Sequence, residues 1–195
     1  WKLYSGALIP LPWNCRPLPL WIRITVSWLP MALPALFSAL RLSHHQTTTV
    51  DRHDVLDGIK NVYIGDRGYC SYNNMAHVVE QGQYFLFRTK DIHSKGLVGN
   101  FNFPDAESFD IDVSVILVRS HSKKVLADIH TEGYIRFVDQ AAAFDYIEYG
   151  SYDTYELSFR ILRFPISTST YECIVTNLPR DEFPVERIKT LYNAR

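Results

Sequence analysis

Several stretches of this 195-residue chain alternate apolar and polar residues in the manner of β-strands. Between 109 and 117 apolar side chains hold the odd positions and Asp or Ser hold three of the even ones, a pattern typical of a half-buried strand. Residues 155–161 repeat this alternation, and 134–139 and 171–177 are rich in β-prone residues. We therefore predict a largely antiparallel β region over 83–178 without a long helix.

An α/β unit precedes this region. Residues 61–66 form a short apolar run that ends in Asp66, as expected for a buried strand. Ser71 can cap a helix over 72–81, whose apolar residues have helical spacing, and a strand over 83–88 follows at once. Functional groups gather at the carboxyl ends of strands in open α/β sheets, so Asp66 is a candidate for chemistry.

A helical period returns near the end of the chain. Residues 181–184, Asp-Glu-Phe-Pro, are a helix-start signal with two acids and a proline in the first turn. An apolar stripe follows, formed by Val185, Ile188, Leu191 and Tyr192. The sequence stops at Arg195 within this pattern, so we expect the helix to continue in a parent protein.

Residues 1–50 differ in composition from the rest of the chain. They contain no Asp or Glu, yet they hold all four tryptophans and six of the ten prolines. Residues 17–40 are apolar enough to suggest a membrane helix, but Arg23, Pro30 and Pro34 interrupt them. We favour an atypical, unstructured segment read from a shifted frame over a membrane segment, and both interpretations stay open. The first residue is Trp and not Met, so we expect a fragment.

The overall composition is that of a globular domain, with 47% apolar and 21% charged residues. A net charge of −1 provides no general basic field, so contact with nucleic acid requires a local patch. Three cysteines without a CxxC pair argue against a disulfide framework and a structural zinc site, which favours a reducing, cytoplasmic location. The histidines have no ligand spacing. Cys70 follows the Asp66 strand, but it lacks a nearby group that would activate a nucleophile.

Four motifs, in order along the chain, carry a resemblance to a known family. They are Tyr63–Tyr69 (YIGDRGY), Tyr84–Asp91 (YFLFRTKD), Thr176–Pro179 (TNLP) and the C-terminal pattern of Ile188, Lys189, Leu191, Tyr192 and Arg195. Over residues 51–195 the chain resembles the DDE transposases of bacterial insertion sequences, in the insertion-sequence-four family.

This resemblance implies an RNase H-like α/β fold interrupted by a mostly antiparallel β insertion. Residues 51–91 would then be part of the core, 92–178 the insertion region, and 179–195 the start of a C-terminal helix. In such enzymes three carboxylates hold two Mg²⁺ ions, and the chemistry is hydrolysis and transesterification of DNA phosphodiesters. The implied partners are DNA at the transposon ends and a second copy in a homodimeric parent enzyme.

The motifs also imply roles for individual residues. Asp66 matches the second metal-binding carboxylate, Tyr192 and Arg195 match contacts to backbone phosphate, and Arg67 is a further candidate DNA contact. Without the motif, Tyr192 would be interpreted as a core residue of the apolar stripe. Weaker candidate contacts are Lys90, Lys95, Lys123, Lys124, Arg160 and Arg163.

Two of the three carboxylates have no counterpart in the sequence given. No acid precedes Asp51, the acids at 51, 54 and 57 are too close to Asp66, and the catalytic Glu is expected beyond Arg195. We therefore predict a transposase fragment that does not cleave or join DNA as given. Two other classes remain open: a non-catalytic module that binds DNA or a partner, and a membrane-tethered domain.

Overall fold

The computed structural model describes residues 60–99, 101–104, 106–129 and 133–193, together with the backbone of four short strands before them. These four strands are β1 (Lys2–Tyr4), β2 (Ala7–Ile9), β3 (Trp21–Val26) and β4 (Leu42–His45). Apart from β3, the apolar stretch 17–40 lies outside the described residues, as do the acids at 51, 54 and 57. No helix in the described ranges is long and apolar enough to cross a membrane.

The elements that follow agree closely with the sequence pattern. In chain order they are β5 (Lys60–Gly65), the 3-10 turn η2 (Arg67–Tyr69), α1 (Tyr72–Glu80), β6 (Tyr84–Thr89), β7 (Phe109–Val118), α2 (Lys123–Asp128), β8 (Tyr134–Phe137), β9 (Thr154–Ser167), β10 (Thr170–Thr176) and α3 (Val185–Asn193). Each predicted strand and both predicted helices are confirmed. The pattern gave no sign of the short α2.

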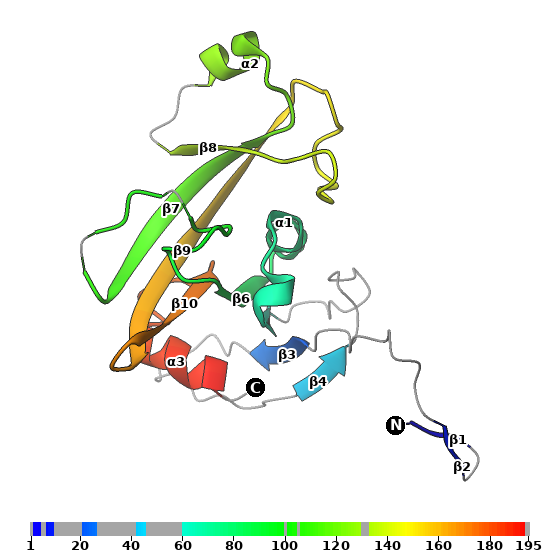
Figure 1. The fold of residues 1–195 in the computed structure, drawn as a ribbon, viewed down its shortest axis with the longest axis vertical. Coiled ribbons are helices and arrows are strands. Elements are labelled where there is room, and N and C mark those ends of the chain that lie inside the picture. Colours follow the sequence, from blue (N-terminus) through cyan, green and yellow to red (C-terminus); the bar gives the residue numbers. More distant parts are fainter. Residues whose placement is uncertain are drawn as a thin grey trace.

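Eight strands form one mixed sheet in the order β4-β3-β5-β6-β10-β9-β7-β8 (Figure 1). β5 and β6 are parallel and are joined by α1, as the α/β unit predicted. The pairs β6·β10, β10·β9 and β9·β7 are antiparallel, which confirms the main prediction for this region, whereas the edge strand β8 runs parallel to β7. The strands of the β region therefore extend the sheet that carries Asp66.

The central strands are buried on both faces. Along β5, Tyr63 belongs to the core cluster on the α1 face, while Val62 and Ile64 belong to the cluster that packs against α3. β6 divides in the same way, with Phe85 and Phe87 on the α1 face. Because successive strand residues point to opposite faces, a nearly continuous apolar run is needed here, and the sequence provides one. The outcome is a sheet between two helical layers.

Local signals fix the ends of α1. The Ser71 hydroxyl accepts a hydrogen bond from the backbone N–H of Asn74 at 3.2 Å, which is the N-cap that the sequence predicted. After the helix the chain reverses at Gly82, whose φ of +63° is a left-handed conformation that glycine adopts without a steric penalty. The reversal delivers the chain directly into β6, parallel to β5.

A buried ion pair joins the β region to the segment that leads into α3. Arg160 in β9, only 4% exposed, donates two hydrogen bonds to the Asp110 carboxylate in β7, at 3.1 and 2.5 Å. It also donates to the backbone carbonyls of Leu178 and Phe183, at 2.8 and 3.1 Å. Burial alone would raise the pKa of Asp110, but the hydrogen bonds from Arg160 and the more exposed Arg180 hold it below its usual value.

Replacing Arg160 tests this connection. We expect Arg160→Ala to lower the free energy of unfolding by about 3–5 kcal/mol, because it removes the buried cation from the Asp110 carboxylate, which keeps only the more exposed Arg180, and takes the donor from two backbone carbonyls. Arg180→Ala is the matched control, since Arg180 binds the same carboxylate with 45% of its side chain exposed, and there we expect a loss below about 1 kcal/mol. Urea denaturation measures both, and equal losses would contradict the role given to Arg160.

Candidate functional site

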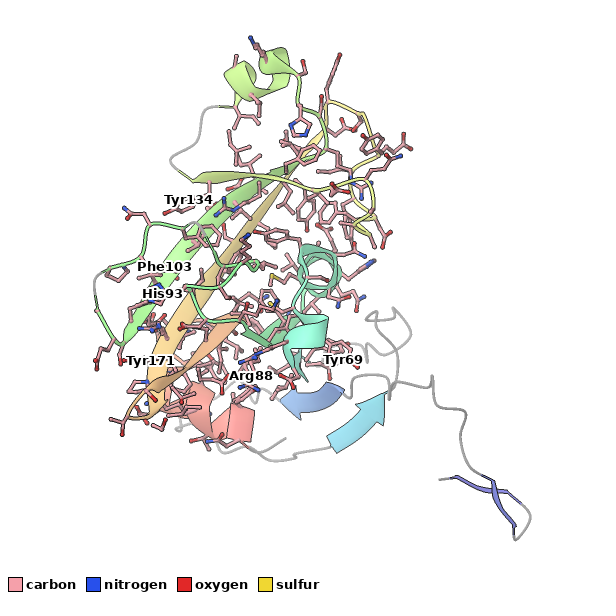
Figure 2. The ribbon with its side chains drawn as sticks, viewed as in Figure 1. Tyr69, Arg88, His93, Phe103, Tyr134 and Tyr171 are labelled. Atoms are coloured by element: carbon pink, nitrogen blue, oxygen red, sulfur yellow. The ribbon has the colours of Figure 1, made fainter. Side chains whose placement is uncertain are left out.

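The candidate site lies where β5 and β6 end. The two strands are parallel, so their carboxyl ends meet at the same edge, and their register pairs Gly65 with Phe87. The residues that follow this pair, Asp66 and Arg88, therefore lie next to each other on the face that α3 covers. Figure 2 labels Arg88 and Tyr69 in this part of the molecule. The predicted position of Asp66, at the carboxyl end of a strand, is confirmed.

The Asp66 carboxylate is held by the turn that follows it. Its Oδ1 accepts a hydrogen bond from the backbone N–H of Arg67 at 2.8 Å, so Asp66 caps η2. Half of the side chain, 50%, is exposed. An aspartate in this setting is fixed in direction and still open to a ligand from solvent.

Gly65 allows the close approach on which this turn depends. A Cβ atom at residue 65 would lie 2.9 Å from the Cβ of Tyr69 and 3.0 Å from the Cδ1 of Phe87. Both neighbours are 2% exposed and belong to the core cluster on the α1 face. The turn packs so tightly against the end of β6 that a side chain at position 65 has no room.

Arg88 connects the site to β10. Its Nε forms a short hydrogen bond with the carboxylate of Glu172, and its guanidinium lies 3.6 Å from Oδ1 of Asp66. Burial would lower the pKa of Arg88, but Glu172, Tyr192 and Asp66 together raise it above its usual value. The guanidinium stays charged and stands between two carboxylates.

Tyr192 approaches from the other side of the site, on α3. Its ring is 5% exposed and packs in the α3 cluster with Ile188 and Leu191, in agreement with the apolar stripe. It is also close enough to Arg88 to influence the pKa of that residue. A cavity of about 160 Å³ adjoins the site and is lined in part by Glu172, Tyr192 and Lys189. Arg195 lies outside the described residues.

The other basic residues that are candidate contacts to DNA differ in their exposure to solvent. Arg67 is exposed directly beside Asp66, as a contact to DNA requires. Arg160 and Arg163 are 4% and 6% exposed and are held in ion pairs, so they do not present their guanidinium groups for the backbone contacts that the sequence suggested for them. Arg163 pairs with Asp91 at 3.0 Å and lies 3.7 Å from the ring centre of Tyr171. β9 is buried without a break over residues 159–164, so both arginines are buried although they lie on opposite faces of the strand.

The described residues do not build a complete divalent-metal site. Within those ranges no group of three His, Cys, Asp or Glu side chains lies together in a way that could hold a metal ion. Asp66 offers carboxylate oxygens, the donors that Mg²⁺ prefers, but the charged group facing it is the Arg88 guanidinium.

The surroundings of Cys70 and His77 indicate structural roles for both residues. Burial raises the pKa of the Cys70 thiol to about 12, against a small opposing effect from Thr89, so a nucleophilic thiolate is not favoured. His77 on α1 binds the Asp145 carboxylate at 2.7 Å and the Tyr146 hydroxyl at 2.9 Å. These contacts fasten the loop before β9 to the helix.

Sequence reasoning missed Arg88 and Glu172 as members of the site. Arg88 lies inside a motif that was recognised, and its phase in β6 matches that of Asp66 after β5, so strand pairing could have brought the two together. Glu172 gave a weaker signal: a single acid in an otherwise apolar strand, whose partner depends on the register between β10 and β6.

The comparisons with known proteins identify the family of the domain that contains Asp66. The sequence pattern of the family described as Transposase DDE domain matches residues 42–195. No curated protein and no solved structure matches the chain.

A methyl group at residue 65 tests the packing of the turn. We expect Gly65→Ala to destabilise the protein by about 1–3 kcal/mol, because the new Cβ overlaps the core. Gly96→Ala is the control, since a Cβ there lies no closer than 3.4 Å to any neighbour, and its effect should be below about 1 kcal/mol. Thermal unfolding of both variants is the measurement. A Gly65→Ala variant as stable as Gly96→Ala would contradict the tight approach.

The raised pKa of Cys70 predicts slow alkylation. At pH 8, well below a pKa of about 12, the thiolate is a very small fraction of the native protein, and that fraction grows only as pH rises toward 12. We expect iodoacetamide to label Cys70 at least about tenfold more slowly in buffer than in urea, where the thiol returns to its ordinary pKa. Peptide mass spectrometry follows the residue, and equal rates would show an accessible thiolate.

Proposed function

Since the chain belongs to the transposase DDE domain family, we propose that it is part of a transposase of the insertion-sequence-four type that acts on DNA. In this proposal Asp66 is the second metal-binding carboxylate of an RNase H-like core. The DNA backbone lies along the edge where β5 and β6 end, with Arg67 and Arg195 as direct contacts, while Tyr192, which is 5% exposed, supports this edge from within the α3 cluster.

One observation carries the proposal most directly. The family match includes the strand that ends in Asp66, and this strand is followed by a crossover helix and a parallel strand. That arrangement exposes a carboxylate at a sheet edge, where open α/β proteins bind ligands. α3 brings Tyr192 to the same edge from the far end of the described chain, which supports a shared role for two family motifs that are distant in sequence.

The proposal includes a limit on activity. Asp66 is the single carboxylate that the motifs assign among the described residues, and two-metal phosphoryl transfer requires several acidic ligands. We therefore propose that the 195-residue polypeptide binds DNA without cutting or joining it, and that Mg²⁺ binds only weakly to it. The division into core, β-rich insertion region and C-terminal helix is part of the same proposal.

DNA binding tests the proposed edge. Fluorescence anisotropy with a labelled duplex at about 50 mM salt should detect weak, salt-dependent binding. We expect Arg67→Ala to weaken it about threefold or more and to reduce the salt dependence by about one phosphate contact.

Lys123→Ala provides the matched control for this measurement. Lys123, one of the weaker candidate contacts from the sequence, is an exposed cation on α2, at the opposite end of the molecule from the proposed edge (Figure 1). Its position argues against a contact there, so its loss should leave the affinity unchanged. If Lys123→Ala weakens binding as much as Arg67→Ala, the charge effect is general and the proposed edge is wrong. If the chain does not bind the duplex at all, the DNA-binding proposal fails.

A further inference from the structure

Three charged side chains meet on the α3 face of the sheet and form one electrostatic unit. Arg88 stands between Asp66 and Glu172, so the unit carries two negative charges and one positive charge. Its surplus of one negative charge disfavours a phosphate by itself and favours a cation. This charge balance therefore favours a cation, and not an anion, as the ligand of Asp66.

The two carboxylates hold Arg88 unequally. Glu172 is 9% exposed and accepts a hydrogen bond from Nε of Arg88, whereas Asp66 is 50% exposed and lies 3.6 Å from the guanidinium. A buried, hydrogen-bonded ion pair resists separation, while an exposed pair at longer distance contributes little. Glu172 therefore anchors Arg88, and Asp66 is the partner that can exchange.

The contacts of Asp66 also leave part of its carboxylate for another ligand. The backbone N–H of Arg67 and the Arg88 guanidinium both approach the same oxygen, Oδ1. Neither contact uses Oδ2. Half of the Asp66 side chain is exposed to solvent, so a cation that approaches from there would bind with an affinity set by how strongly the neighbouring guanidinium already neutralises the carboxylate.

We propose that Arg88 and Glu172 are positioning residues for Asp66: Glu172 holds Arg88 on β10, and Arg88 is the resident counter-ion that competes with a divalent cation for the Asp66 carboxylate. The inference rests on the proposed role of Asp66 as a metal ligand. It goes further by naming the two side chains that set the strength of that ligand. Loss of Glu172 would leave Asp66 as the main anionic partner of Arg88 and make the competition stronger.

Mn²⁺ titration of the full chain, followed by NMR, tests this competition. Mn²⁺ broadens amide signals near its binding site, so the signals of Gly65 and Arg67 report binding at Asp66 even when it is weak. We expect Arg88→Gln to tighten Mn²⁺ binding at this position about threefold to tenfold, because the competing cation is gone. We expect Glu172→Gln to weaken it by a similar factor, and Glu172→Asp to restore most of the loss.

The double variant separates positioning from general charge. If Glu172 acts through Arg88, then Glu172→Gln added to Arg88→Gln changes the affinity less than twofold, well below its effect in the native background. Equal weakening in both backgrounds would show a long-range charge effect and overturn the inference, as would an Arg88→Gln variant with native affinity. Thermal unfolding of each variant confirms that it is folded.

Asp66→Asn separates a failure of the inference about Arg88 and Glu172 from a failure of the proposed function of Asp66. We expect it to abolish the local broadening in the native and Arg88→Gln backgrounds. Broadening that depends on Asp66 but is insensitive to Arg88 and Glu172 overturns only the inference. Absence of broadening at Gly65 and Arg67 in every variant overturns the assignment of Asp66 as a metal ligand and the inference with it.

Discussion

The buried ion pair between Arg160 and Asp110 is the constraint on which the C-terminal part of this structure depends. It crosses from β9 to β7 and also binds the carbonyls of Leu178 and Phe183, so one guanidinium fixes two strands and the segment before α3. α3 can cover its face of the sheet only because this segment leaves β10 in a fixed direction. The position of Tyr192 beside Arg88 follows from that direction, which makes a side chain remote from Asp66 responsible for the shape of the site.

The site lies where the buried core of the sheet ends and polar side chains become exposed to solvent. β5 and β6 are buried on both faces along their length, and the polar groups appear where the strands end. Rigid strands set the positions of Asp66 and Arg88, and the exposed turn gives Asp66 access to solvent. The charges that meet there are of both signs and are partly buried, so their mutual arrangement matters more than the overall charge of −1.

The sequence predicted the elements whose signals are local. The Ser71 cap, the helical spacing of 72–80 and the alternation in β7 each act within a few residues, and the structure agrees with all of them. The parallel pairing of β8 with β7 was not predictable, because it depends on the path of the chain between the two strands. The Arg88–Glu172 contact was missed for the same reason, because it depends on the register between β6 and β10. A period of two shows which residues of a strand share a face, but it does not show which strands are neighbours.

The pairing of β6 with β10 also has a kinetic consequence. Asn177 accepts a hydrogen bond from the backbone N–H of Phe85, a residue 92 positions earlier in the chain, at the point where the two strands meet. A loop of that length must close before β6 gains its second neighbour, and contacts so distant in sequence slow folding. During synthesis on a ribosome, β5, α1 and β6 emerge before β9 and β10, and the side of β6 that pairs with β10 stays open until the β9–β10 hairpin has been made. The strand that becomes the centre of the sheet is thus the one that stays longest available for pairing with other chains.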